Sequence, residues 1–90
     1  MLRIEFDAIV FQEGKIYVAY SPKLDVSSCG NTVDEAKGNL KTAVRLFLEE
    51  SAKMGSLEDI LEEAGYESKG ADYWTAPRVV ATELVDLQAQ

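Results

Sequence analysis

The fold is decided by residues 32–55, which read TVDEAKGNLKTAVRLFLEESAKMG. Thr32 and Glu35 have the spacing of a capping box, in which each side chain accepts a hydrogen bond from a free backbone N–H group at the start of a helix. The pattern predicts an amphipathic helix over residues 33–54, with Gly55 as its left-handed terminator. Its buried stripe consists of Ala36, Leu40, Ala43, Val44, Phe47 and Leu48. We interpret Gly38 as permitting a close approach of this helix to a sheet.

Three strands are predicted before this helix. Residues 2–10 alternate between apolar and charged side chains over most of their length, which is the period of a strand with one wet face. Residues 15–20 return as a second strand, rich in aromatic and β-branched side chains. Pro22 ends this hairpin, because proline cannot donate to a strand ladder. A short third strand over about residues 26–29 then reaches the turn at Gly30-Asn31.

A second helix and a last strand are predicted after residue 55. Ser56 and Asp59 repeat the capping spacing, the apolar face is Leu57, Ile60, Leu61 and Ala64, and Gly65 stops the helix. Residues 66–77 show no clear period, whereas residues 78–87 are predicted as a strand that is apolar on both faces. Such a strand must lie inside a sheet or pair across a subunit interface, because a long apolar edge left bare aggregates.

The order of these elements is β-β-β-α-α-β, which predicts an α+β fold. One small antiparallel sheet would pack under one long and one short helix. Ninety residues leave room for a single domain, residues 1–90. A chain this short gains from association with a second copy, so we expect a homo-oligomer, either a dimer or a tetramer.

Composition excludes several functions. With one cysteine, Cys29, and no histidine, the chain has neither an internal disulfide nor a Cys/His zinc cluster, and it lacks a histidine base. We therefore expect no catalytic residues, no metal site and no cofactor, and we expect Cys29 to be a half-buried space filler. A net charge of −7 disfavours direct binding of nucleic acid. No apolar run approaches the length of a membrane span, so the expected location is the cytoplasm.

The negative charge is concentrated in residues 49–67, which hold seven acids and one base, Lys53. This segment is either a solvated helical face or a docking surface for a cationic partner. The candidate partner-binding residues are Glu58, Asp59, Glu62 and Glu63. Lys37, Lys41 and Arg45 form a basic stripe on the long helix, which is either solvated or in contact with the acidic segment of another subunit.

Apolar and aromatic side chains near the C-terminus are candidates for an oligomer interface. Tyr73 and Trp74 stand in an otherwise polar stretch, where they either fold over the edge of the core or anchor an interface. The predicted last strand adds further interface candidates, which are Val80, Thr82 and Leu84.

Residues 17–36, which read YVAYSPKLDVSSCGNTVDEA, resemble the HicB-like antitoxin family. The shared features are a hairpin strand, a P-x-L element, a short strand that closes on glycine, and the pattern T-x-x-E-A-x-x-N-L at the head of the long helix. With the element at residues 61–66, the resemblance covers about residues 4–66. It implies a partial ribonuclease-H-like fold, self-association, and binding to a HicA-type ribonuclease toxin, which is small and basic and has an essential histidine.

Full antitoxins of this family often add a DNA-binding segment. Here residues 67–90 contain only Lys69 and Arg78 as bases, so we expect no C-terminal DNA-binding domain. Together with the acidic segment, the resemblance implies an antitoxin-like module that covers the active surface of a basic toxin. One alternative is an orphan homo-oligomeric protein of the same fold without a toxin partner. A second is a carboxylate-dependent nuclease, for which Asp7 and Glu35 are the nearest candidates.

Overall fold

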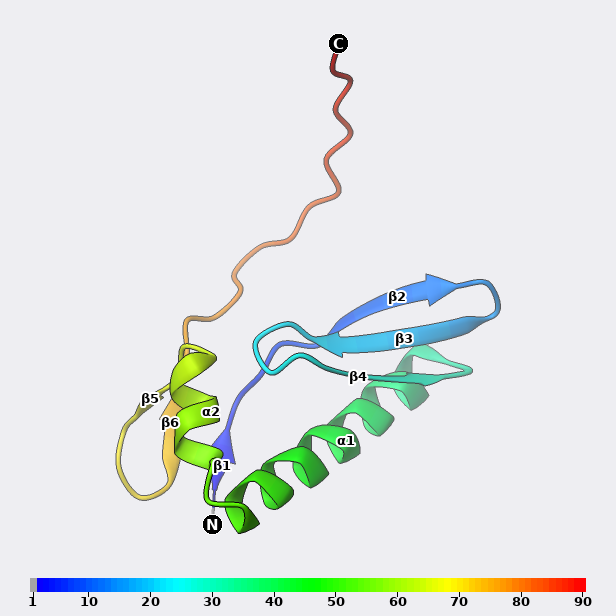
Figure 1. Cartoon of the computed structure of the whole chain (residues 1–90). Coiled ribbons are helices and arrows are strands. Elements are labelled where there is room, and N and C mark those ends of the chain that lie inside the picture. Colours follow the sequence, from blue (N-terminus) through cyan, green and yellow to red (C-terminus); the bar gives the residue numbers. More distant parts are fainter. Residues whose placement is uncertain (1) are drawn as a thin grey trace.

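Residues 2–90 are described by a computed structural model, in which the long helix lies along an antiparallel sheet (Figure 1). Strands β2 (Ile9–Glu13), β3 (Ile16–Ser21) and β4 (Val26–Gly30) pair in the order β2-β3-β4, with β3 in the centre. Helix α1 (Val33–Lys53) packs mainly against β4 and β3. This half of the molecule is the hairpin, third strand and long helix that the sequence predicts.

A second, smaller sheet lies near the C-terminal part of α1 (Figure 1). Strands β1 (Arg3–Ile4), β5 (Glu67–Ser68) and β6 (Tyr73–Thr75) pair in the order β1-β6-β5. The central strand β6 is parallel to β1 and antiparallel to β5. Figure 1 shows α2 (Leu57–Glu63) beside this sheet.

The predicted α+β class, with strands before the helices, is confirmed. The sheet, however, is divided in two. Residues 2–10 do not form one strand: β1 and β2 are separated by residues 5–8 and belong to different sheets. Alternation reports which side chains are apolar, but it does not report which neighbouring backbone each part of a strand will meet.

The predicted start of α1 is confirmed by two hydrogen bonds. The N–H of Glu35 donates to Thr32 Oγ1 (3.0 Å), and the N–H of Asn31 donates to Glu35 Oε1 (3.1 Å). The helix ends at Lys53, followed by Gly55 at φ 75°. The predicted second capping box is wrong, because the Ser56 side chain caps no backbone N–H; its hydroxyl donates to the Ser51 carbonyl instead (3.4 Å).

The close approach of α1 to the sheet occurs at Gly30, and the prediction for Gly38 is wrong. A Cβ atom on Gly30 would lie 2.7 Å from the backbone nitrogen of Ala36, whereas a Cβ on Gly38 would meet no atom within 4 Å. The glycine that matters is therefore the last residue of β4, because the chain turns there directly into the first turn of the helix.

One core cluster joins the two sheets and both helices. Helix α1 supplies four members of its predicted stripe, Ala36, Leu40, Val44 and Leu48, whereas Ala43 and Phe47 are only half-buried. The remaining members come from elsewhere in the chain: Ala19, Leu24, Leu61, Tyr66 and Trp74. The stretch at 66–77, which shows no period in the sequence, thus supplies two core aromatics as well as β5 and β6.

The predicted strand over residues 78–87 does not lie inside a sheet of this chain, and its pairing across a subunit interface stays a prediction. The last strand is β6, and residues 76–90 form an extended tail without strand pairing that leads away from both sheets (Figure 1). A strand needs a neighbouring backbone that completes its hydrogen bonds, and residues 2–75 supply none to the tail.

Candidate protein-binding surfaces

Helix α2 presents an acidic face. Leu61 is buried and Leu57, Ile60 and Ala64 are half-buried on its inner side. The opposite side carries the predicted partner-binding residues, all of them exposed: Glu58, Asp59, Glu62 and Glu63. The amphipathic pattern of the helix thus brings the four carboxylates together.

The charge of this acidic face is not neutralised by the part of the chain that the structure describes. The ion pairs of residues 2–90 are Lys23–Asp7, Lys69–Glu67 and Arg78–Glu5, none of which involves α2. Carboxylates four residues apart on a helix repel each other. Glu62 and Glu63 also stand at the C-terminal end of α2, where the helix dipole disfavours negative charge. A cationic partner would relieve both effects.

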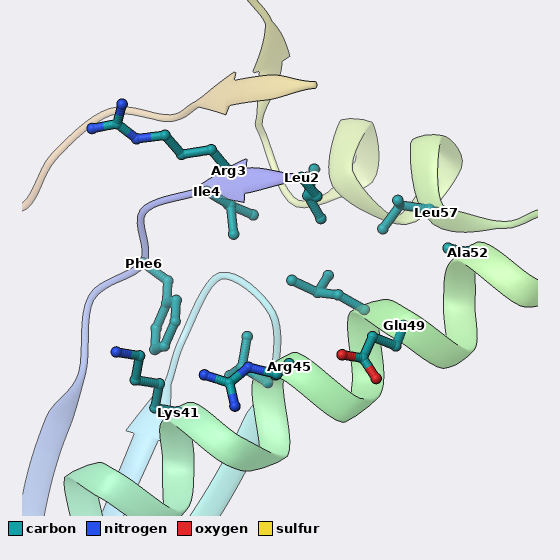
Figure 2. Close-up of a pocket in the computed structure, with 11 residues that line it drawn as sticks. Leu2, Arg3, Ile4, Phe6, Lys41, Arg45, Glu49, Ala52 and Leu57 are labelled. Carbon is teal, nitrogen blue, oxygen red and sulfur yellow. The ribbon is translucent and has the colours of Figure 1, made fainter. Parts of the chain in front are cut away.

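A pocket of about 610 Å³ separates β1 from α1 (Figure 2). Leu2, Ile4 and Phe6 point into it from the N-terminal segment. Its other apolar side chains come from the helices: Val44, Leu48, Ala52 and Leu57. Charged side chains border it, namely Arg3, Lys41, Arg45 and Glu49. We call this the β1–α1 pocket; it is apolar within and basic at its border.

The N-terminal wall of the pocket is held by Tyr66. Its hydroxyl donates a hydrogen bond of 2.6 Å to the backbone carbonyl of Glu5. Tyr66 is buried, and this desolvation, followed by the nearby negative charges of Asp7 and Glu5, raises its pKa to about 12. The phenol therefore stays protonated and remains a donor at physiological pH.

The basic stripe is divided by the pocket. Lys41 and Arg45 line it, whereas Lys37 does not. All three are exposed, and within residues 2–90 none takes part in an ion pair. Sequence reasoning found the stripe but missed the pocket, because no periodicity shows that residues 2–6 cross over α1.

The C-terminal tail exposes most of its apolar side chains. Val80 and Leu84 are 94% and 99% exposed, and Thr82 between them is also exposed. Val79, Val85 and Leu87 add to this surface. Arg78 fastens the base of the tail, since its Nη2 donates to Glu5 Oε1 (3.0 Å) and Oε2 (3.3 Å).

The two aromatic interface candidates lie in β6. Trp74 is 8% exposed and belongs to the core. Tyr73 is half-buried, with the guanidinium of Arg3 over its ring at 5.2 Å. Their predicted role in an interface with a second copy stays a prediction. Trp74, however, exposes little surface that a partner could contact.

The carboxylates considered for a nuclease both have structural roles. Asp7 Oδ2 accepts a hydrogen bond of 2.7 Å from Lys23, and Glu35 caps α1. Within residues 2–90 there is no group of three or more acidic, cysteine or histidine residues that could hold a metal ion. Cys29 is exposed, so the prediction of a half-buried filler is wrong.

No model of a known protein family, no curated protein and no solved structure matches this chain. The resemblance to HicB-like antitoxins thus rests on the order and spacing of its sequence motifs. Among residues 2–90, no helix is long and apolar enough to cross a membrane.

Proposed function

We propose that this chain is an antitoxin-like protein-binding module that neutralises a small basic ribonuclease of HicA type by covering its active surface. The observation that carries the proposal is the acidic face of α2, which is exposed and takes part in no ion pair within residues 2–90. The motif order shared with HicB-like antitoxins supports it, because basic toxins are the partners of that family.

Electrostatic attraction would bring the partners together, and apolar contact would hold them. Complementary charge raises association rates and excludes wrong partners more than it adds affinity. Ile60, which is half-buried and lines a pocket together with Glu63 of the acidic face, can supply apolar contact. Met54, three residues before the start of α2, is 73% exposed and can add to it. The module itself performs no chemistry in this proposal; it keeps RNA from the toxin's active surface.

Co-expression with a HicA-type toxin tests the proposal, the natural choice being a short basic reading frame with a histidine next to this gene. The chain should restore growth and co-purify with the toxin. Reversing two charges of the acidic face, Glu58→Lys with Glu62→Lys, should abolish both effects. A matched control is Glu13→Lys with Glu50→Lys, because these exposed residues lie outside α2 and the change in net charge is the same. Equal rescue by the two double variants would contradict the proposal.

A second candidate is an orphan homo-oligomeric protein of the same fold. The observation that favours it is the tail, since a contiguous exposed apolar segment marks an interaction site or an aggregation hazard. Failure of both rescue and co-purification with any neighbouring gene product, together with a stable oligomer, would favour this second function.

A further inference from the structure

We propose that residues 78–87 of one copy lie in the β1–α1 pocket of a second copy, and that the exchange is reciprocal, giving a two-fold dimer. This inference is independent of the acidic face of α2, so it holds or fails separately from toxin binding. The pocket and the tail do not contact each other within one chain. In the dimer, the tail of each copy would fill the pocket of the other.

The first argument is apolar complementarity. The tail carries Val80 and Leu84 almost fully exposed, and the pocket is walled by side chains such as Ile4, Phe6 and Leu48. Soluble proteins seldom leave such surfaces bare. Both faces of an extended tail are apolar, so a site with apolar walls on two sides suits it better than a flat surface.

The second argument is charge. Beyond Arg78 the tail carries Glu83 and Asp86 and no base. The pocket is bordered by Lys41 and Arg45, which have no ion-pair partner within residues 2–90. In an extended segment Leu84 and Val85 point to opposite sides, so each can contact one wall of the pocket, while Asp86 and Glu83 lie within reach of the basic border. In this arrangement the basic stripe contacts the acids of the tail of another subunit, and not the acidic segment at residues 49–67.

The third argument is the direction of the tail. Arg78 is fastened to Glu5, an exposed residue between the half-buried Ile4 and Phe6 that face the pocket. From that anchor the tail leads away from α1 (Figure 1). An extended segment of ten residues spans roughly 33 Å, which is enough to reach a neighbouring molecule. Two-fold symmetry then places two tails in two pockets and doubles the contact.

Sedimentation velocity over a wide range of protein concentration tests the proposal. We expect a monomer–dimer equilibrium for the unaltered full chain. Lys41→Glu with Arg45→Glu should raise the dimer dissociation constant about tenfold or more, and Glu83→Lys with Asp86→Lys should do the same. Combining the four substitutions restores opposite charges and should return the dissociation constant most of the way to its original value.

Matched controls separate this contact from net charge. Lys15→Glu with Lys37→Glu changes the charge as much as the Lys41/Arg45 variant, but neither residue lines the pocket, so the dimer should persist. Leu84→Asp should also dissociate the dimer; at 99% exposure, Leu84 can be changed without unfolding the chain, which circular dichroism would verify.

Several outcomes would overturn the inference. One such outcome is a chain that is monomeric at every concentration and whose residues 79–87 are protected from hydrogen exchange. That result would mean that the tail packs against its own chain. A dimer that survives Leu84→Asp or the Lys41/Arg45 reversal uses another surface. Glu58→Lys with Glu62→Lys should leave the dimer intact, so a dimer without toxin binding, or the reverse, tells the two proposals apart.

Discussion

Helix α1 and the C-terminal tail both carry a series of large apolar side chains, yet these side chains end in opposite environments. Leu40 and Val44 of α1 are almost fully buried, whereas Leu84 of the tail is 99% exposed. The pattern of α1 fits the sheet that precedes it in the same chain, whereas residues 77–90 of the tail are exposed throughout. The comparison teaches that an apolar pattern predicts burial, but not which molecule provides the cover.

The largest expected effect contrasts a leucine from each segment. Leu40→Ala should lower the free energy of unfolding by about 2–5 kcal/mol, because it removes a fully buried side chain and leaves a cavity. Leu84→Ala should change the stability of the monomer by less than about 0.5 kcal/mol. Urea unfolding at low protein concentration measures both. Similar losses would show that the tail packs on its own body.

The next effect tests how closely the end of β4 packs against the first turn of α1. Gly30→Ala should cost roughly 1–3 kcal/mol, because its Cβ would be 2.7 Å from the backbone of Ala36, which cannot swing aside as a side chain does. Gly38→Ala, in the open interior of the helix, should instead stabilise by about 0.5–1 kcal/mol. Thermal unfolding of the two variants should therefore shift in opposite directions.

Tyr66 tests the connection between the core and the segment that walls the pocket. Tyr66→Phe should cost about 1 kcal/mol through the lost hydrogen bond to Glu5. The folded-state pKa, about 12, lies above the usual tyrosine value of about 10. The protonated phenol therefore stabilises the fold fully below pH 10, and this contribution is lost as the pH rises towards 12.

The measurement for Tyr66 is unfolding by denaturant between pH 9 and pH 12, combined with ultraviolet titration of the tyrosines. The unaltered chain should lose stability over the upper part of this range, and Tyr66→Phe should lose less. A Tyr66 that titrates near the usual tyrosine pKa of about 10 would disprove its burial against Glu5.

The smallest effect concerns the base of the tail. Arg78→Ala removes an ion pair whose partners are 75% and 54% exposed, so the monomer should lose less than about 0.5 kcal/mol. Added salt should reduce even this difference. Chemical denaturation at low protein concentration measures this loss of stability. A loss well above about 0.5 kcal/mol would mean that the tail packs on its own chain, in contrast to its exposed apolar side chains.

Local signals were read correctly where the chain satisfies its own backbone groups nearby. The capping residues Thr32 and Glu35 and the terminator Gly55 belong to this class. The acidic face of α2 also follows directly from helical spacing. Trp74 could not be assigned to the core, because its burial depends on β1, which is about seventy residues earlier in the chain.

The pocket and the division of the sheet could not be read from the sequence either. Both require the N-terminal segment to depart from the direction of β2 and β1 to pair with β6, a strand about seventy residues later in the chain. Gly30 and Gly38 show the same limit: a sequence shows where glycine stands, but only the packed chain shows what a side chain would meet there.

By itself, the sequence determined the helices, the hairpin, the third strand and the uneven charge, because capping, periodicity and turn formation act between residues a few positions apart. Only the tertiary structure decided that the first strand divides between two sheets, that Trp74 is buried, and that the tail remains uncovered. Those outcomes depend on which distant surfaces meet, and a pattern along one segment carries no information about the surface that will oppose it.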